Sequence, residues 1–286
     1  MSTPAVVLEA ARERRRRFAG NNLLVIGCGI VIGLAVLLAA FGPLLAPHDP
    51  DAANLGNAYV GPVAGHPLGF DSQGRDLFSR LLTGARTSMA GPFLVVLVSV
   101  LSGTTLAVTA AWAGRWVDAT ISTVLDILFA FPAILLAVLA AAVFGAGLTA
   151  PTLALAIAYT PYVARVLRGA ALRERARDYV AACEVQGLSA FGICARHLVP
   201  NLTPLIVAQA TLLFGYAMVD FAAISFIGLG VQPPTADWGV MVASGQAGVL
   251  QGYPMESLTA GLSIVVVVVA VNLLGERLAA KDSEGR

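Results

Sequence analysis

The sequence predicts an all-α protein that crosses a membrane with six helices. Of its 286 residues, 57% are hydrophobic and only 12% are charged, whereas roughly 25% of the residues in an average soluble domain are charged. Mean hydropathy is +0.79, and apolar stretches recur at about the 20 residues that a helix needs to cross a bilayer. The formal net charge of +1 excludes a strong overall field that would attract nucleic acid or acidic substrates.

Apolar length places the six spans at about 23–46, 89–112, 119–145, 149–168, 202–230 and 258–280. The first follows the basic stretch RERRRRF. It is too long for the apolar core of a secretion signal and no small-x-small cleavage site follows it, so we expect a retained helix. The chain therefore divides into a basic N-terminal segment, 1–22, and a single transmembrane domain, 23–286.

Residues that disfavour helix lie inside these spans, among them Pro132, Pro161 and Gly215. Neighbouring helices in a membrane bundle satisfy the carbonyl groups that such residues leave free. We therefore expect the prolines to kink their helices rather than to end them.

The distribution of Lys and Arg predicts the orientation. Of the 18 basic residues, all but Arg75, Arg80 and Arg86 lie at the two termini, between spans two and three, or close to the connection between spans four and five. Because basic residues stay on the cytoplasmic side, both termini and residues 169–200 are predicted to be cytoplasmic. The segments 46–88 and 231–257 are then the outer loops.

Several kinds of chemistry find no support in the sequence. Its three cysteines make no CxxC pair, and His48, His66 and His197 are far apart in sequence, so we expect no disulfide framework and no metal site. The only lysine, Lys281, stands in a tail without the rest of a GxxxxGK[ST] phosphate-binding loop. With no nucleophile and base in a recognisable pattern either, no catalytic residues are predicted.

The cytoplasmic stretch YVAACEVQGLSAFGICARHLVPN, 179–201, favours a docking element. The charged residues before it, such as Arg173 and Glu174, would also suit a solvated connector. A connector, however, has no need of small and apolar side chains on both sides of Gly187. That pattern predicts two short helices, separated by a glycine turn, that fit a groove of another protein.

This stretch resembles the cytoplasmic loop of bacterial ABC importer permeases. Ala181, Ala182 and Cys183 occupy the E-A-A triplet of that loop, Gly187 is its glycine, and RHLVPN, 196–201, matches its end. Ala181 replaces the usual Glu, and Glu184 stands where related sequences often have a basic residue. The resemblance implies that the loop couples the permease to an ATPase through the residues Tyr179, Ala181, Ala182, Cys183, Glu184, Gly187, Leu188, Ser189 and Pro200.

Two longer motifs narrow the resemblance. HPLGFDSQGRDLFSRLLTGARTS, 66–88, and SFIGLGVQPPTADWGVMVA, 225–243, are similar to signatures of the C-type permeases for dipeptides, oligopeptides and nickel. The resemblance implies the type I ABC importer permease fold in the bacterial inner membrane. It also implies a B-type permease, two ATP-binding subunits and an extracytoplasmic binding protein as partners, with ATP and Mg²⁺ bound by the ATPases and no cofactor in this chain.

The outer loops suggest a structural cap. Glycines and prolines after span five predict a re-entrant or capping loop, with a gate or a contact for the binding protein as the alternative. Acidic and basic residues before span two predict an ion-pair network that also includes Arg86. The outer motif residues are Asp71, Gly74, Arg75, Asp76, Arg80, Gln232, Pro233 and Trp238.

Three polar residues in the spans are candidates for the translocation path or for the interface with the partner permease: Asp126, Asp220 and Ser225. An intramembrane carboxylate is a functional candidate because its burial in lipid is costly, although Asp126 lies near enough to the span end to reach the interface.

The predicted function is import of di- or oligopeptides. The alternatives are import of nickel chelates, haem or other peptide-like solutes by the same machinery, and a stand-alone secondary transporter with a proton relay through Asp126 and Asp220.

Overall fold

The computed structural model describes the backbone of residues 4–284 and the side chains of residues 24–279. Its helices, in chain order, are α1 (Pro4–Leu45), the 3₁₀ turn η1 (Leu55–Asn57), α2 (Leu77–Trp112), α3 (Arg115–Phe129), α4 (Ala133–Phe144), α5 (Thr149–Arg175), α6 (Asp178–Val185), α7 (Ala190–Ile193), the π-turn η2 (Cys194–Leu198), α8 (Val199–Phe226), α9 (Trp238–Ser244), α10 (Gln246–Leu250) and α11 (Met255–Glu284). The described part of the chain has no named strand, which confirms the all-α class. The arginine cluster of the predicted segment 1–22 lies outside the residues whose side chains are described.

Five helices are long and apolar enough to cross a membrane, and the pair α3 and α4 makes a sixth crossing if it counts as one broken span. These two helices are bent by 77° at the break between them. The expectation that Pro132 only kinks its helix was wrong, because the chain leaves the helical conformation at Pro132, whose ψ is 129°. Pro161 and Gly215, by contrast, lie within the continuous helices α5 and α8.

Helix α2 extends well beyond the span predicted for it, beginning at Leu77 rather than near residue 89. The carboxylate of Asp76 accepts a hydrogen bond from the backbone N–H of Ser79 at 2.9 Å and so caps the free end of the helix. The first turns of α2, from Leu77 to about residue 88, therefore belong to the segment that the sequence assigned to the outer loop. The predicted outer segment 46–88 is a loop only as far as Asp76.

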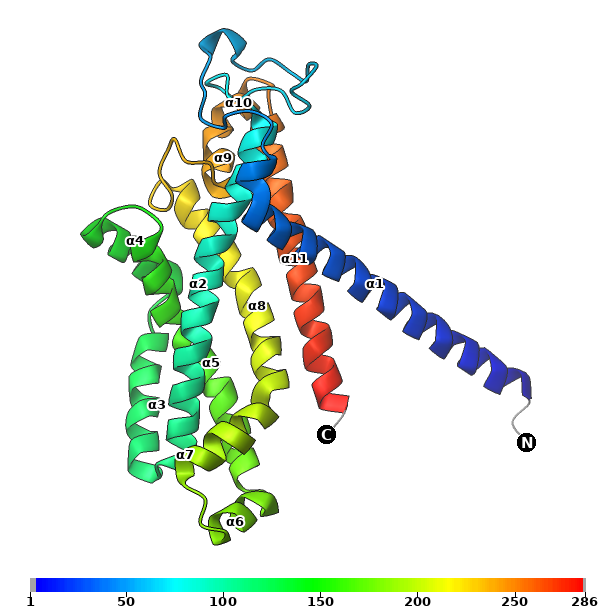
Figure 1. Ribbon diagram of the computed structural model, residues 1–286, viewed down its shortest axis with the longest axis vertical. Helices are drawn as coiled ribbons and strands as arrows, with labels where there is room; N and C mark the ends of the chain where they lie inside the picture. Colours follow the sequence, from blue (N-terminus) through cyan, green and yellow to red (C-terminus); the bar gives the residue numbers. More distant parts are fainter. Residues whose placement is uncertain (1–3, 285–286) are drawn as a thin grey trace.

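The long helices α2, α5, α8 and α11 run roughly along the long axis of the molecule, and α1 crosses near their upper end and then diverges (Figure 1). At the crossing, a Cβ added to Gly42 would lie 2.1 Å from the carbonyl oxygen of Leu82, so only glycine permits this approach. Short helix α9 closes the upper end between α8 and α11.

Small side chains let α2 and α5 pack closely. Ala107, Ala156 and Ala164 are almost completely buried between the helices, and a Cβ added to Gly103 would lie 2.8 Å from Cβ of Val163. The hydroxyl of Ser99 donates to the carbonyl oxygen of Ala156 at 2.9 Å. In lipid, where apolar burial does not favour one helix surface over another, close packing and such hydrogen bonds hold helices together.

We expect Gly103→Ala to destabilise the fold and Gly33→Ala to leave it unchanged or slightly stabilised. Both changes raise helix propensity by roughly 1 kcal/mol, but only the first forces a methyl group into Val163, and overpacking costs about 1–3 kcal/mol. A Cβ added to Gly33 meets no atom within 4 Å. Thermal unfolding in detergent, followed by circular dichroism, measures the difference; equal midpoints for the two variants would contradict this account of the α2–α5 contact.

Candidate functional site

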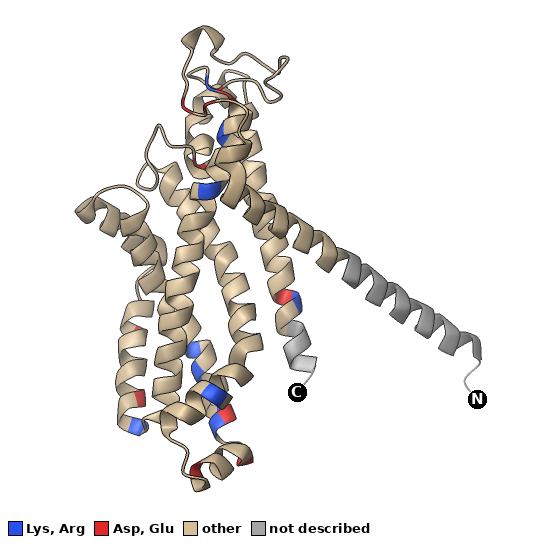
Figure 2. Cartoon of the chain, viewed as in Figure 1, with Lys and Arg blue, Asp and Glu red and all other residues tan. Residues whose placement is uncertain are grey.

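Most of the charged residues in the described part of the chain gather at the two ends of the bundle (Figure 2). The lower end carries the arginines of α5 together with Arg177 and Arg196, which flank the segment α6–α7, and the upper end carries the loop before α2. A long apolar region separates the two.

A buried carboxylate organises the lower end. Glu174, in the last turn of α5, is 4% exposed. It accepts hydrogen bonds from Tyr179 Oη of α6 and from Asn201 Nδ2 of α8, both at 3.0 Å, and pairs with Arg177 Nε at 3.1 Å. One side chain thus joins the end of α5, the start of α6 and the start of α8.

Arg175 attaches the same corner to α2. Its guanidinium donates to the carbonyl oxygens of Ala111 and Trp112, the latter at 2.9 Å, and lies 4.8 Å from the centre of a Trp112 ring. The last carbonyl groups of a helix have no partner within the helix, so a guanidinium there satisfies them. The lower ends of α2, α5 and α8 therefore form one polar clamp.

Below this clamp, α6 and α7 project with their apolar side chains exposed. Gly187 makes the turn between them with a φ of +80°, as the sequence predicts, and Ser189 caps α7 by accepting from the N–H of Gly192 at 3.2 Å. Val185 and Phe191 are 89% and 83% exposed, and Leu188 is also exposed. An apolar surface on a rigid base, at the end where the arginines gather, is suited to a protein partner.

The predicted coupling residues mostly lie on this projecting surface. Those that are exposed are Ala181, Ala182, Glu184, Gly187, Leu188, Ser189 and Pro200. Tyr179 and Cys183 are half-buried, and Tyr179 belongs to the clamp through its contact with Glu174.

The middle of the bundle contains a hollow of about 390 Å³ with aromatic walls. Its lining residues are Phe129, Phe131, Pro132, Ala133, Ala158, Tyr159, Tyr162 and Tyr216. Tyr159 Oη donates to Asp220 Oδ2 at 2.7 Å, so the predicted carboxylate candidate of α8 is joined to the wall of the hollow. The break at Pro132 places the end of α3 and the start of α4 beside it.

The other two intramembrane candidates lie elsewhere. Asp126 is exposed and pairs with Arg165 at 2.6 Å, and Arg165 in turn covers a face of the Phe129 ring. Ser225 is 1% exposed, and a Cβ added to Gly239 would lie 2.8 Å from its Cβ. Among the residues that line the described hollow, neither Asp126 nor Ser225 is present.

At the upper end, the predicted ion-pair network forms in part. Asp71 pairs with Arg75 at 2.6 Å and with Arg80 at 3.7 Å, and all three side chains are buried. Asp76 instead lies against His48 and His66, and Arg86 is exposed and makes no ion pair with the described side chains. Asp76 and Arg86 are therefore not part of the ion-pair network that the sequence predicted for them.

Arg80 connects the two outer loops. Its Nη1 donates to the carbonyl oxygens of Pro50 and Pro234 at 3.0 and 3.3 Å and pairs with Asp51 at 3.3 Å. A fully buried guanidinium with acceptors from both loops holds them against the start of α2.

Further contacts of the outer motifs are structural. Trp238 Nε1 donates to the carbonyl oxygen of Leu81 at 2.9 Å, and Gln232 Nε2 donates to those of Gly228 and Gly230 at 2.9 Å. Gly74 has a φ of +70°, and a Cβ there would lie 1.8 Å from the carbonyl oxygen of Asn54. Pro233, the remaining motif residue, is exposed.

Sequence reasoning missed several residues that the structure makes important. Glu174 fitted a solvated connector, Tyr159 was not singled out, and Asp237 was one letter within a longer motif. Asp237 is 1% exposed and accepts a hydrogen bond from Ser88 Oγ at 2.7 Å. Burial raises the pKa of its carboxyl group, although this hydrogen bond opposes the rise. Of the three, Asp237 carries a sequence signal, since it follows the glycines and prolines after span five and directly precedes Trp238.

The expectation that no histidines share a site relied on their separation in sequence. The structure places the rings of His48 and His66 with centroids 4.2 Å apart. His197 lies in η2, at the opposite end of the bundle.

Comparisons with known proteins place these features in a family. Residues 103–281 match the family described as binding-protein-dependent transport system inner membrane component, and residues 11–62 match the N-terminal transmembrane domain of oligopeptide transport permease C. A dipeptide transport system permease protein of Alkalihalophilus pseudofirmus is 37% identical over 93% of this chain and 87% of its own length. A glutathione transport system permease protein of Pectobacterium atrosepticum is 35% identical over 93% and 88%.

A solved structure shares the fold. The methionine ABC transporter MetNI, in an inward-facing conformation, contains a chain that superposes with a TM-score of 0.57 at 20% identity, covering 70% of this chain and 95% of that one.

We expect Arg80→Met to lower the stability of the protein strongly and Arg86→Met to leave it within about 0.5 kcal/mol of the wild type. Removing the buried guanidinium deprives Asp71 of one of its two cations and leaves two loop carbonyl groups without their donor, at a cost of about 3–5 kcal/mol. Arg86 on the same helix is exposed. Thermal midpoints in detergent measure both effects, and a loss for Arg86→Met as large as that for Arg80→Met would refute the assignment.

Proposed function

This chain belongs to the family of binding-protein-dependent transport system inner membrane components, and we propose that it is the permease subunit of an ATP-driven importer of di- and oligopeptides. It is a non-catalytic membrane subunit of the type I ABC importer permease fold. Permeases of this family work in an assembly with ATPases and a binding protein. The specific composition that we propose is one B-type permease, two ATP-binding subunits that hold ATP and Mg²⁺, and one extracytoplasmic binding protein.

The observation that carries the coupling role is the exposed segment α6–α7 on its rigid base. Val185 and Phe191 present an apolar surface that fits a groove of an ATPase subunit. Because Glu174 joins α6 to both α5 and α8, a displacement of the docked segment moves these two helices with it. ATP-driven approach of two ATPases would then alternate access to the central path.

The proposed orientation follows from the charges. Among the described residues, the arginines of α5, with Arg177 and Arg196 that flank the segment α6–α7, gather at one end of the bundle, whereas Arg75, Arg80 and Arg86 lie at the other (Figure 2). Under the positive-inside rule, this distribution supports a cytoplasmic location for the α6–α7 end and, with it, for both termini. The outer loops then face the binding protein.

We assign the aromatic hollow to the translocation path. Tyr159, Tyr162 and Tyr216 offer ring faces and hydroxyl groups, which suit the mixed polar and apolar character of a peptide. Asp220 lies behind Tyr159 and sets the direction of its hydroxyl group. The same chemistry would accept glutathione or another peptide-like solute, so the binding protein decides between them.

A proton-driven carrier fits the arrangement less well. Asp126 is engaged by Arg165 and Asp220 by Tyr159, and these two pairs share no hydrogen bond in the described structure. A proton relay would need a connected chain of such groups.

Purification of the chain from native membranes, followed by reconstitution of what accompanies it in liposomes, tests the proposed function. We expect a second permease, ATPase subunits and peptide uptake that requires ATP. A chain that is isolated alone and transports in response to a proton gradient would overturn the proposal.

We expect Gly187→Ala to uncouple ATP hydrolysis from uptake and Gly169→Ala to have no effect. Alanine at a φ of +80° costs about 1–2 kcal/mol, which favours another turn between α6 and α7. Neither added Cβ meets an atom within 4 Å, and Gly169 lies inside helix α5, so only conformation distinguishes the two variants. The ratio of peptide imported to ATP hydrolysed by the reconstituted importer measures the coupling; an unchanged ratio for Gly187→Ala would argue against the role of the turn.

We expect Asp220→Asn and Tyr159→Phe to reduce uptake several-fold. Each variant loses the charge-assisted hydrogen bond that orients the Tyr159 hydroxyl group in the wall of the hollow. Such a hydrogen bond is worth about 1.5–3 kcal/mol. Assembly with the partner subunits should be retained. Initial uptake rates together with subunit stoichiometry measure this, and wild-type uptake by both variants would exclude a role of the pair in transport.

A further inference from the structure

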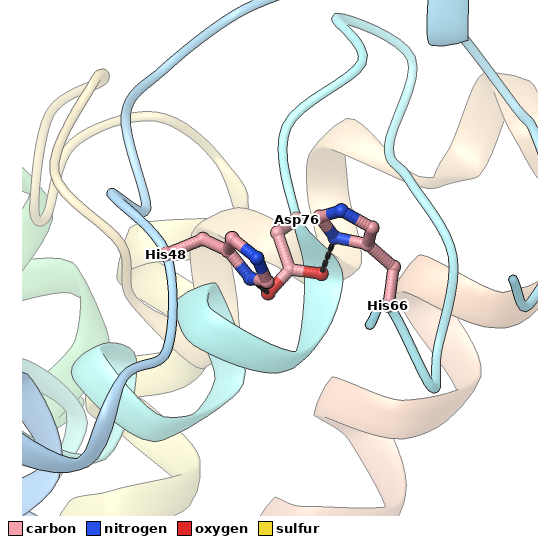
Figure 3. Close-up of side chains that lie close together, drawn as sticks. All are labelled: His48, His66 and Asp76. Atoms are coloured by element: carbon pink, nitrogen blue, oxygen red, sulfur yellow. Dashed lines mark hydrogen bonds and ion pairs between the residues drawn. The ribbon is translucent and has the colours of Figure 1, made fainter. Parts of the chain in front are cut away.

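Two histidines and an aspartate meet at the outer end of the bundle, outside the regions to which transport has been assigned. His48 follows α1, His66 lies in the loop between η1 and α2, and Asp76 caps α2. Figure 3 shows the Asp76 carboxylate next to the imidazole groups of both histidines. The chain thus brings three potential metal ligands, two imidazoles and one carboxylate, together from separate segments.

The spacing of the ligand atoms is close to that around a single metal ion. His66 Nδ1 lies 2.9 Å from Asp76 Oδ1, His48 Nδ1 lies 3.7 Å from Asp76 Oδ2, and one ligand atom of each residue lies within 4.8 Å of the others. Ligand atoms of a tetrahedral Zn²⁺ ion, at bond lengths of about 2.0–2.2 Å, are about 3.4 Å apart. Small rotations of the side chains therefore suffice to admit an ion.

Neighbouring groups hold the three side chains in place. Asp76 Oδ2 accepts from both the N–H and the hydroxyl of Ser79, at 2.9 and 2.6 Å, whereas Oδ1 contacts only His66 among the described residues. The backbone N–H of His48 donates to the same hydroxyl at 3.1 Å, and the Phe70 ring lies 4.4 Å from that of His66. One carboxylate oxygen is thus committed to the helix cap and the other is available to a ligand.

The charge of the aspartate suits a cation. The carboxylate is 2% exposed, whereas the side chains of His48 and His66 are 41% and 23% exposed. A cation could approach the imidazoles from the outer solution.

A purely structural role would explain only part of this arrangement. The hydrogen bond between His66 and Asp76 already ties the outer loop to the start of α2, and it needs no second imidazole. The His48 ring stacks on that of His66 with 25° between the planes, and its Nδ1 faces the same carboxylate at a distance beyond hydrogen-bond range. Without an ion, the described contacts give this second ring no hydrogen-bond partner.

We propose that His48, His66 and Asp76 form a binding site for a divalent transition-metal ion of the Zn²⁺ type. Imidazole and carboxylate ligands favour such ions over Mg²⁺ and Ca²⁺, and three protein ligands leave a fourth position for water. The ion joins the residue after α1 and the outer loop to the first turn of α2, and so fastens the outer loop to the bundle.

The test uses the full-length chain in detergent, carrying a tag without histidine and stripped of metal by a chelator. Zn²⁺ is titrated in competition with a fluorescent chelator, and Co²⁺ is added separately so that its visible spectrum reports the ligand set. The variants are His48→Gln, His66→Gln and Asp76→Asn, the last of which keeps a good helix cap while removing the charge. His197→Gln, at the opposite end of the bundle, is the matched control.

We expect one equivalent of Zn²⁺ to bind the wild type and the control with equal affinity, and each of the three variants to bind at least tenfold more weakly. The wild type should also show the visible bands of tetrahedral Co²⁺, and metal should raise its thermal midpoint but not those of the three variants. Absence of a stoichiometric site in the wild type would overturn the proposal. Undiminished binding by His48→Gln and His66→Gln would overturn it equally.

Discussion

The buried carboxylate of Glu174 is the contact on which the rest of the lower end depends. It receives hydrogen bonds from α6 and α8 while belonging to α5, and the adjacent Arg175 ties the same corner to α2. An isolated buried carboxylate would be expensive, but this one has three partners that are fixed by the helices themselves. The clamp makes the lower ends of three long helices one unit, and α6 is attached to that unit rather than suspended from a free loop.

This arrangement reflects the solvent in which the helices lie. Lipid does not favour apolar association of helices, so the middle of the bundle relies on small side chains such as Gly103 and Ala164, which allow close approach. Polar groups hold the ends, where water or buried partners satisfy them. At the upper end Arg80 fastens both outer loops, and at the lower end Glu174 fastens α6. Between them, the break at Pro132 and the tyrosines of α5 and α8 line a hollow.

The sequence predicted the features that depend on local pattern. Apolar length located the spans, and Gly187 among small residues correctly predicted two short helices with a turn between them. It could not predict contacts between distant segments, because these depend on which side chains the packing brings together. From sequence alone Glu174 resembles a solvated residue, because its partner Asn201 lies on the distant helix α8. His48 and His66 likewise seem unrelated, because only the folded outer loop brings their rings together. Pro132 was misjudged for the same reason, since whether a proline kinks or ends a helix depends on neighbours that sequence does not reveal.

If Glu174 holds α6 against α5, the two helices move as one body, and a distance measured within the chain reveals whether they do. Spin labels at Cys183 on α6 and at a cysteine introduced for Ile157 on α5, with Cys28 and Cys194 replaced by alanine, would be separated by roughly 27 Å along α5 alone. In the assembled importer we predict one narrow distance distribution that does not change when ATP is added, and a broad distribution for Glu174→Gln. A wild-type distance that shifts with ATP, or a Glu174→Gln variant as narrow as the wild type, would contradict the account.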